Sequence, residues 1–158
     1  MKFYTIGVYG STEQEFFQKL ADHHIDTFCD IRQRRGVRGA KYAFVNSNRL
    51  QRKLEEMDIK YAHILELAPT KEIRELQKEA DLQKGELKRE RQELGQVFKI
   101  AYKNKILSHF DFDGFLNKLD EIAADNVVFF CVEELPEACH RSLVTERLHK
   151  MGYEFEHL

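Results

Sequence analysis

The feature that most constrains the fold is an uninterrupted apolar run, VVFFCV, at residues 127–132. Such a run is typical of a strand in a parallel sheet that is buried on both faces. Shorter strand candidates alternate along the chain with segments of helical periodicity. The strand candidates are residues 2–6, 25–31, 59–65 and 153–156, and the helix candidates are residues 12–23, 46–57, 95–107, 112–123 and 138–151. The alternation predicts an α/β fold, a three-layer sandwich with a mainly parallel sheet of about five strands.

Local signals place individual helices. Thr12 is followed three residues later by Glu15, which is the spacing of a capping box and predicts the start of the first helix. In the segment 95–107, the three- and four-residue spacing of Val97, Ile100 and Ala101 predicts that these side chains face the core.

The 158 residues are enough for one domain, and we expect a single α/β domain over residues 1–158. Residues 71–93 hold seven Lys or Arg and seven Asp or Glu, which indicates a charged helical insertion at about 70–95. Its balanced charge is more typical of a solvated face than of a binding surface. Ile73, Leu76 and Ala80 give its first half one apolar stripe.

Composition excludes several classes of protein. The net charge of −2 excludes a histone-like polycation, although a local basic patch is compatible with it. No apolar stretch approaches the roughly 20 residues of a membrane span. Three Cys and two Pro argue against a disulfide-stapled secreted fold. We therefore expect a cytoplasmic protein that does not bind a membrane.

In an open parallel sheet, ligands bind beyond the carboxyl ends of the strands, so the strand-to-helix turns are the places to inspect. The first turn contains Gly7 and Gly10, which would let the backbone approach a ligand closely. The turn lacks the G-x-G-x-x-G pattern of dinucleotide-binding proteins, and a tight turn explains the two glycines equally well.

The second turn follows Asp30 and is rich in cations. Residues 32–41 carry five basic side chains and no acidic one: Arg32, Arg34, Arg35, Arg38 and Lys41. Guanidinium groups bind phosphate oxygens in a forked geometry, so this concentration favours a phosphate-bearing ligand. The alternative is an exposed basic loop without a ligand. Asp30 and Arg32, at the end of the strand, are expected to belong to the site in either case.

The third turn follows the apolar strand and contains Glu133, Cys139, His140, Arg141 and Ser142. Cys139 lies where a helix dipole lowers a thiol pKa, but it also shares an apolar face, which favours a small buried thiol. The Cys-to-Arg spacing of a phosphatase loop is absent. Cys131, Cys139 and His140 lack the paired spacing of a structural zinc site, so no metal site is predicted. Metal binding with Cys29 or Glu133 remains an alternative.

The same residues resemble the domain of unknown function 488 family over nearly the whole chain. The most specific match is the motif C-x-E-x-x-P-x-x-C-H-R-S at residues 131–142. Further matches are Thr5-Ile6-Gly7, Gly10, Asp30-Ile31-Arg32, Ile59-Lys60-Tyr61, His63 and residues 67–74. The chain departs from the family pattern in the Arg/Gly-rich loop, where a proline is usual, and at Ala68, where a glycine is usual. The resemblance implies a Rossmann-like fold and a polar cluster of Asp30, Arg32, Glu133, Cys139, His140 and Arg141, but it implies no reaction.

The leading hypothesis is a protein that binds a phosphate-bearing ligand, a nucleotide or a nucleic acid, at the carboxyl edge of the sheet. Arg32 and Arg141 would hold the anion, together with Lys71 or Arg74. Further ligand contacts are expected from Gly7, Gly10, Cys139 and Ser142. Glu133, His140 and Asp30 are the candidate catalytic residues if the protein is an enzyme, which the sequence does not specify, just as it specifies no cofactor and no oligomeric state.

Two alternatives stay open. One is a noncatalytic nucleic-acid-binding module whose contacts are Arg34, Arg35, Arg38 and Lys41. The other is thiol-based catalysis, which would require a reactive Cys139. The whole interpretation requires that the segments near residues 30 and 140 converge on one site.

Overall fold

Five strands form one sheet in which every pair of neighbours is parallel. The computed structural model describes residues 1–88 and 90–158. The strand order is β3-β2-β4-β1-β5. Their bounds are β1 Lys2–Ile6, β2 Thr27–Asp30, β3 Lys60–His63, β4 Asn126–Phe130 and β5 Phe155–His157. The predicted α/β class and parallel sheet are thereby confirmed.

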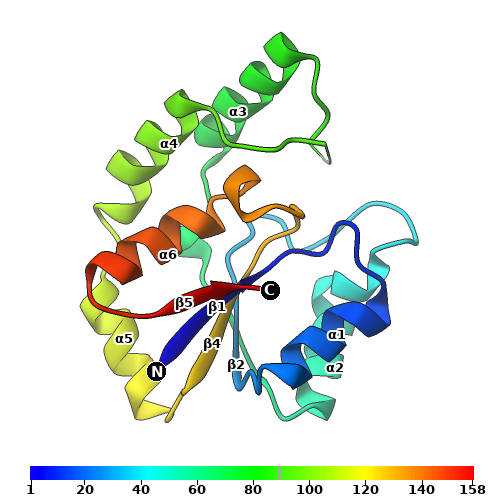
Figure 1. The fold of residues 1–158 in the computed structure, drawn as a ribbon, viewed down its shortest axis with the longest axis vertical. Helices are drawn as coiled ribbons and strands as arrows, with labels where there is room; N and C mark the ends of the chain where they lie inside the picture. Colours follow the sequence, from blue (N-terminus) through cyan, green and yellow to red (C-terminus); the bar gives the residue numbers. More distant parts are fainter. Residues whose placement is uncertain (89) are drawn as a thin grey trace.

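Helices cover both faces of this sheet and give the three predicted layers (Figure 1). The helices α1 and α2 lie on one face, and α5 and α6 lie on the other. The helices α3 and α4 pack against each other beyond the carboxyl ends of the strands, at the top of Figure 1. Their bounds are α1 Glu13–Asp22, α2 Ser47–Glu56, α3 Lys71–Lys84, α4 Gln96–Tyr102, α5 Phe112–Glu121 and α6 Arg141–Lys150. Among the described residues, no helix combines the length and the apolar character needed to cross a lipid bilayer.

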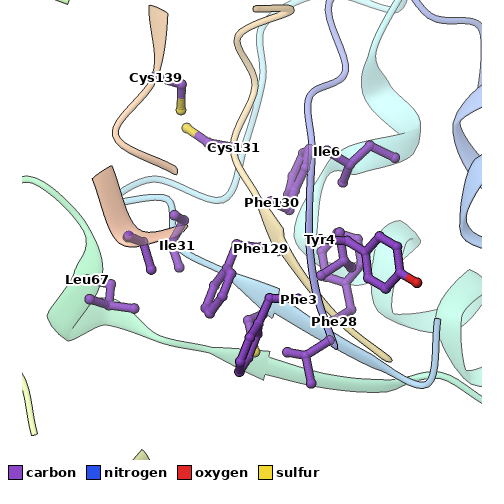
Figure 2. Packing of buried hydrophobic residues seen from close by; sticks show 14 of the residues in the cluster. Phe3, Tyr4, Ile6, Phe28, Ile31, Leu67, Phe129, Phe130, Cys131 and Cys139 are labelled. Carbon is purple, nitrogen blue, oxygen red and sulfur yellow. The ribbon is translucent and has the colours of Figure 1, made fainter. Parts of the chain in front are cut away.

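The local signals act as the sequence predicts at α1 and β4. The Thr12 side chain accepts a hydrogen bond from the Glu15 backbone N–H, and the Glu15 side chain accepts one from the Thr12 N–H, completing the capping box. The β4 residues Val127 to Phe130 are fully buried because helices pack on both faces of this central strand. Their rings contact aromatic side chains of β1 and β2 in the core shown in Figure 2.

For the helix at 95–107, the prediction is right about Ala101, which is partly buried against the core, and wrong about Val97 and Ile100. Val97 and Ile100 are 62% and 58% exposed, whereas Phe98 and Tyr102 are buried. The two aromatic rings stack with centroids 5.9 Å apart, and the Tyr102 hydroxyl donates to the carbonyl of Leu67 at 2.6 Å. Aromatic rings have more apolar surface to bury than Val or Ile side chains, and the buried Tyr102 hydroxyl has a hydrogen-bond partner, which accounts for the orientation of α4.

The register brings three strands to the same level at the carboxyl edge. Asp30 of β2 and Ile6 of β1 both pair with Phe130 of β4. The chain then leaves β1 and β2 toward one face of the sheet and leaves β4 toward α6 on the opposite face (Figure 1). This divergence of neighbouring loops is the position where open α/β sheets bind ligands.

Candidate anion-binding cavity

A cavity of about 650 Å³ lies at this carboxyl edge. The loop after β2, the turn after β4, the segment before α6, helix α3 and the following segment up to Phe98 all contribute to its wall. Its polar and charged lining includes Arg32, Arg34, Arg38, Arg74, Lys78, Asp81, Lys88, Arg91, Glu133 and His140. Four of these, Arg34, Arg38, Lys78 and Lys88, are exposed, so the cavity is open to solvent.

Asp30 holds Arg32 in a buried, two-pronged ion pair. The Arg32 Nε and Nη2 atoms donate to the two carboxylate oxygens of Asp30 at 2.9 and 2.7 Å. Tyr61 donates its hydroxyl to the same carboxylate at 2.8 Å, and Nη2 of Arg32 also donates to the carbonyl of Val45 at 3.0 Å. The guanidinium lies over the Phe130 ring, 4.7 Å from its centroid. Arg32 is therefore fixed in one position, because paired and stacked guanidinium groups lose little further freedom on binding.

The segments near residues 30 and 140 meet, as the sequence predicts. His140 Nε2 donates to the carbonyl of Ile31 at 2.9 Å, and Arg32 and His140 both line the cavity. On the β3 side, His63 Nε2 donates to the carbonyl of Arg32 at 2.8 Å. The carbonyls of Ile31 and Arg32 are thus held by two histidines from different parts of the chain.

Glu133 is a buried carboxylate surrounded by cations. Its Oε1 atom lies 3.0 Å from Arg91 Nη2 and 3.5 Å from Lys88 Nζ, and its Oε2 atom accepts a hydrogen bond from the Cys131 thiol at 3.1 Å. Burial alone would raise the pKa of Glu133, but Lys88 and Arg91 outweigh it and lower the pKa from 4.5 to about 2. Glu133 is therefore ionised near neutral pH and does not serve as a proton donor there.

Arg91 is a site residue that the sequence analysis missed. It is 8% exposed and also pairs with Asp81 at 3.3 Å, and Gln77 donates to Asp81 at 2.7 Å. The charged stretch 71–93 is thus not only a solvated face, since Gln77, Asp81 and Arg91 are buried. A four-residue spacing on α3 places three buried residues on one face: Ile73, Gln77 and Asp81. This spacing, in which two polar residues continue an apolar stripe, is the sequence signal that could have indicated a buried polar group here.

Two cysteines and a histidine lie together beside Glu133. The Cys131 and Cys139 sulfurs point toward one another (Figure 2), and Cys139 Sγ lies 3.7 Å from His140 Nδ1. The hydrogen bond between the thiols and then burial raise the pKa of Cys131 well above its ordinary value. Burial opposes the charged form of His140, but the neighbouring Cys131 and Glu133 outweigh it and raise its pKa. With Cys139 only 1% exposed, the geometry fits the predicted buried thiol and lends no support to thiol-based catalysis.

Arg141 lies next to the cavity without lining it. Its Nη1 and Nη2 atoms donate to the carbonyls of Glu133 and Glu134 at 2.5 and 2.9 Å, and its Nε atom donates to the Thr5 hydroxyl at 3.3 Å. Gly7 lies against the same turn, since a Cβ at this position would be 1.9 Å from the Glu133 carbonyl oxygen. Arg141 and Gly7 therefore brace the turn after β4 against β1.

Two other predicted ligand contacts also make hydrogen bonds within the protein. Gly10 has a φ of +83°, and its N–H donates to the Tyr42 hydroxyl at 3.0 Å. Ser142 donates its hydroxyl to the carbonyl of Cys139 at 2.9 Å. Neither residue lines the cavity.

The basic loop divides between the cavity and the surface. Arg34 and Arg38 line the cavity. Arg35 donates to the Tyr61 hydroxyl at 3.5 Å, and this hydrogen bond raises its pKa. Lys41 is exposed, with its Nζ 5.3 Å from the centroid of the Tyr42 ring.

The lining is strongly cationic. Within the described residues it contains seven Lys or Arg and three Asp or Glu. Three buried nitrogen atoms of this lining have no hydrogen-bond partner in the part of the chain that the structure describes: Arg32 Nη1, Arg74 Nε and Arg91 Nε. A buried donor without an acceptor is costly, so each of these three atoms would be stabilised by an acceptor atom within hydrogen-bond distance.

In comparisons with known proteins, the chain matches a family model only. No curated protein and no solved structure matches the chain. A family model with the description "Domain of unknown function DUF488" matches residues 12–148. The match spans the basic loop, α3 and the turn after β4, so it contains most of the cavity lining described above. The chain belongs to the DUF488 family.

Proposed function

We propose that the cavity binds a small phosphate-bearing anion. The observation that carries this proposal is the buried Arg32, which Asp30 fixes in place while its Nη1 donor has no partner among the described residues. The lining has four more cationic than anionic side chains, which supports the same conclusion because the excess positive charge would neutralise a phosphate.

Of the predicted anion contacts, Arg32 and Arg74 are the ones in position to act. Arg74 lines the cavity and has an unpartnered buried Nε atom. Lys71, on the same helix, does not line the cavity; its side chain is 82% exposed and lies 4.0 Å from Glu75. Asp30 acts as a positioning residue, since both of its oxygens accept hydrogen bonds from Arg32.

A catalytic role for Glu133 as a general base has little support. Its pKa of about 2 makes it a weak base, and both of its oxygens have partners. The proposal is therefore one of anion binding, in which Glu133 holds Arg91 and Lys88 in place instead of taking up a proton.

The test is calorimetric titration of the full chain with inorganic phosphate, pyrophosphate and a nucleoside triphosphate. We expect Arg74→Gln to weaken binding by roughly tenfold or more, because a hydrogen bond to a charged group contributes about 1.5–3 kcal/mol. Lys71→Gln is the matched control, three residues away on α3, and should leave the affinity unchanged. Absence of saturable binding to all three anions, or equal weakening by both variants, would overturn the proposal.

A nucleic-acid module using the basic loop is the competing outcome. Exposed Arg34, Arg38 and Lys41 would contact the phosphate backbone, so affinity for a single-stranded oligonucleotide would fall steeply with salt. Lys41→Gln distinguishes the two, because Lys41 does not line the cavity. If Lys41→Gln weakens oligonucleotide binding and the small anions do not bind, the nucleic-acid function replaces the one proposed.

A further inference from the structure

The cluster of Cys131, Cys139 and His140 has the donor set of a transition-metal site. One potential ligand atom from each residue lies within 4.8 Å of the others, and all three residues are buried. Cys131 directly follows β4, whereas Cys139 and His140 directly precede α6. The ligands therefore come from two segments that the fold brings together, which explains why a search for closely paired cysteines in the sequence missed them.

The orientation of His140 suits a metal ligand. A carbonyl oxygen only accepts hydrogen bonds, so the contact with Ile31 places a proton on Nε2. In the neutral ring, the lone pair is then on Nδ1, the atom that faces Cys139 Sγ at 3.7 Å. A backbone carbonyl that fixes the tautomer in this way is the usual outer partner of a metal-bound histidine.

The distances are close to those that Zn²⁺ requires. With Zn–S of about 2.3 Å and Zn–N of about 2.1 Å, a tetrahedral site places sulfur and nitrogen about 3.6 Å apart. The observed separation of 3.7 Å between Cys139 Sγ and His140 Nδ1 matches this value. The three ligand atoms lie within 4.8 Å of one another, and a tetrahedral site places two sulfurs about 3.8 Å apart, so binding would draw the cysteine side chains together by about 1 Å or less.

We propose that Cys131, Cys139 and His140 bind one Zn²⁺ ion whose fourth coordination position faces the cavity. Glu133 is not counted as a ligand because Arg91 and Lys88 hold its Oε1 atom. All three proposed ligands line the cavity, so the fourth position is open to water or to a ligand bound there. Three protein ligands with one open position are typical of catalytic rather than structural zinc sites.

Charge and protons balance in this site. Zn²⁺ replaces the two thiol protons, which leave to solvent, and the resulting two thiolates neutralise the ion while His140 stays neutral. Loss of the Cys131 proton ends its hydrogen bond to Glu133, and the freed Oε2 atom can then accept one from a zinc-bound water. The site does not depend on the anion-binding proposal, since none of its ligands is a lysine or arginine.

The experiment is titration of the reduced, chelator-treated full chain with Co²⁺ and then Zn²⁺ under anaerobic conditions. We expect one Co²⁺ per chain, with thiolate-to-cobalt charge-transfer absorption that Zn²⁺ abolishes by displacement. Cys131→Ser, Cys139→Ser and His140→Asn should each weaken Zn²⁺ binding by about 100-fold or more, because loss of an outer partner alone costs 10–100-fold. Cys29→Ser is the matched control, since Cys29 is buried in β2 outside the cluster, and it should bind as the unchanged protein does.

The spectrum of the unchanged protein tests the proposal without any substitution, so misfolding of a variant cannot obscure the result. Absence of charge-transfer absorption at one equivalent of Co²⁺ would overturn it. Persistence of the absorption in a Cys131→Ser/Cys139→Ser double variant would also overturn it, as would its loss in Cys29→Ser with the fold retained by circular dichroism. If oxidation joins Cys131 to Cys139 and abolishes binding, and reduction restores it, the result supports the cluster as the ligand set.

Discussion

Replacement of Asp30 by Asn tests the central role of the Asp30–Arg32 pair. The two side chains are 0% and 3% exposed, so the substitution leaves the Arg32 charge buried without its counter-ion. Breaking a buried ion pair by removing one partner costs about 3–5 kcal/mol. In either orientation the Asn amide presents its N–H₂ group to Nε or to Nη2 of Arg32, which places two donors in opposition.

The assay is urea unfolding followed by circular dichroism. With a slope of about 2 kcal/mol per molar urea, the cost predicts a midpoint lower by roughly 1.5–2.5 M. The double variant Asp30→Leu/Arg32→Met removes both charges and should recover most of the loss, because an apolar pair of similar volume is often neutral. The reasoning is refuted if Asp30→Asn costs less than about 1 kcal/mol, or if the double variant is as unstable as the single one.

Two further predictions concern the turn after β4. The pKa of Glu133 is depressed to about 2 in the folded protein, so its stabilising effect is complete above pH 4.5 and is lost as the pH falls toward 2. The difference in urea midpoint between the unchanged protein and Glu133→Gln should therefore shrink over that range, and a difference independent of pH would contradict the assigned ionisation. Gly7→Ala should cost about 1–3 kcal/mol or more, because its Cβ would lie 1.9 Å from the Glu133 carbonyl oxygen. Gly36→Ala, whose Cβ would meet only Asn46 Oδ1 at 3.8 Å, is the control in the same melting experiment, and equal losses would count against a steric cause.

The sequence predicts the sheet and the helices that cover it well, because the spacing of apolar residues along these elements shows which side chains are buried. The apolar run of β4 and the capping box of Thr12 are local signals, and the structure contains both features where they were expected. The orientation of α4 is different in kind. Phe98 and Tyr102 compete with Val97 and Ile100 for the interior, and the outcome depends on a long-range hydrogen bond to Leu67 that no local pattern shows.

The residues around the cavity also divide into those that local sequence signals locate and those whose position depends on long-range contacts. Asp30, Arg32, Glu133 and His140 lie at strand ends or in the turn after a strand, so the rule for parallel sheets locates them from the sequence. Arg91 comes from a charged stretch, and its buried charge is compensated by Glu133 and Asp81, which are distant or unremarkable in the sequence pattern. Arg141 is a strong candidate by residue type, yet nearby carbonyls use its donors, and this depends on the path of the turn rather than on the motif.

The bracing of the turn by Arg141 has a consequence for how a ligand would be received. The Arg141 guanidinium links the turn after β4 to β1. It donates to the carbonyls of Glu133 and Glu134 in the turn and to the Thr5 hydroxyl of β1. This turn forms a preorganised part of the cavity wall, so it loses little conformational freedom when a ligand binds. The entropic cost of binding a ligand comes instead from ordering the long, exposed side chains of the lining, such as Arg38 and Lys78. We therefore expect the rigid turn to determine which ligands fit, while the ordering of exposed side chains lowers the affinity.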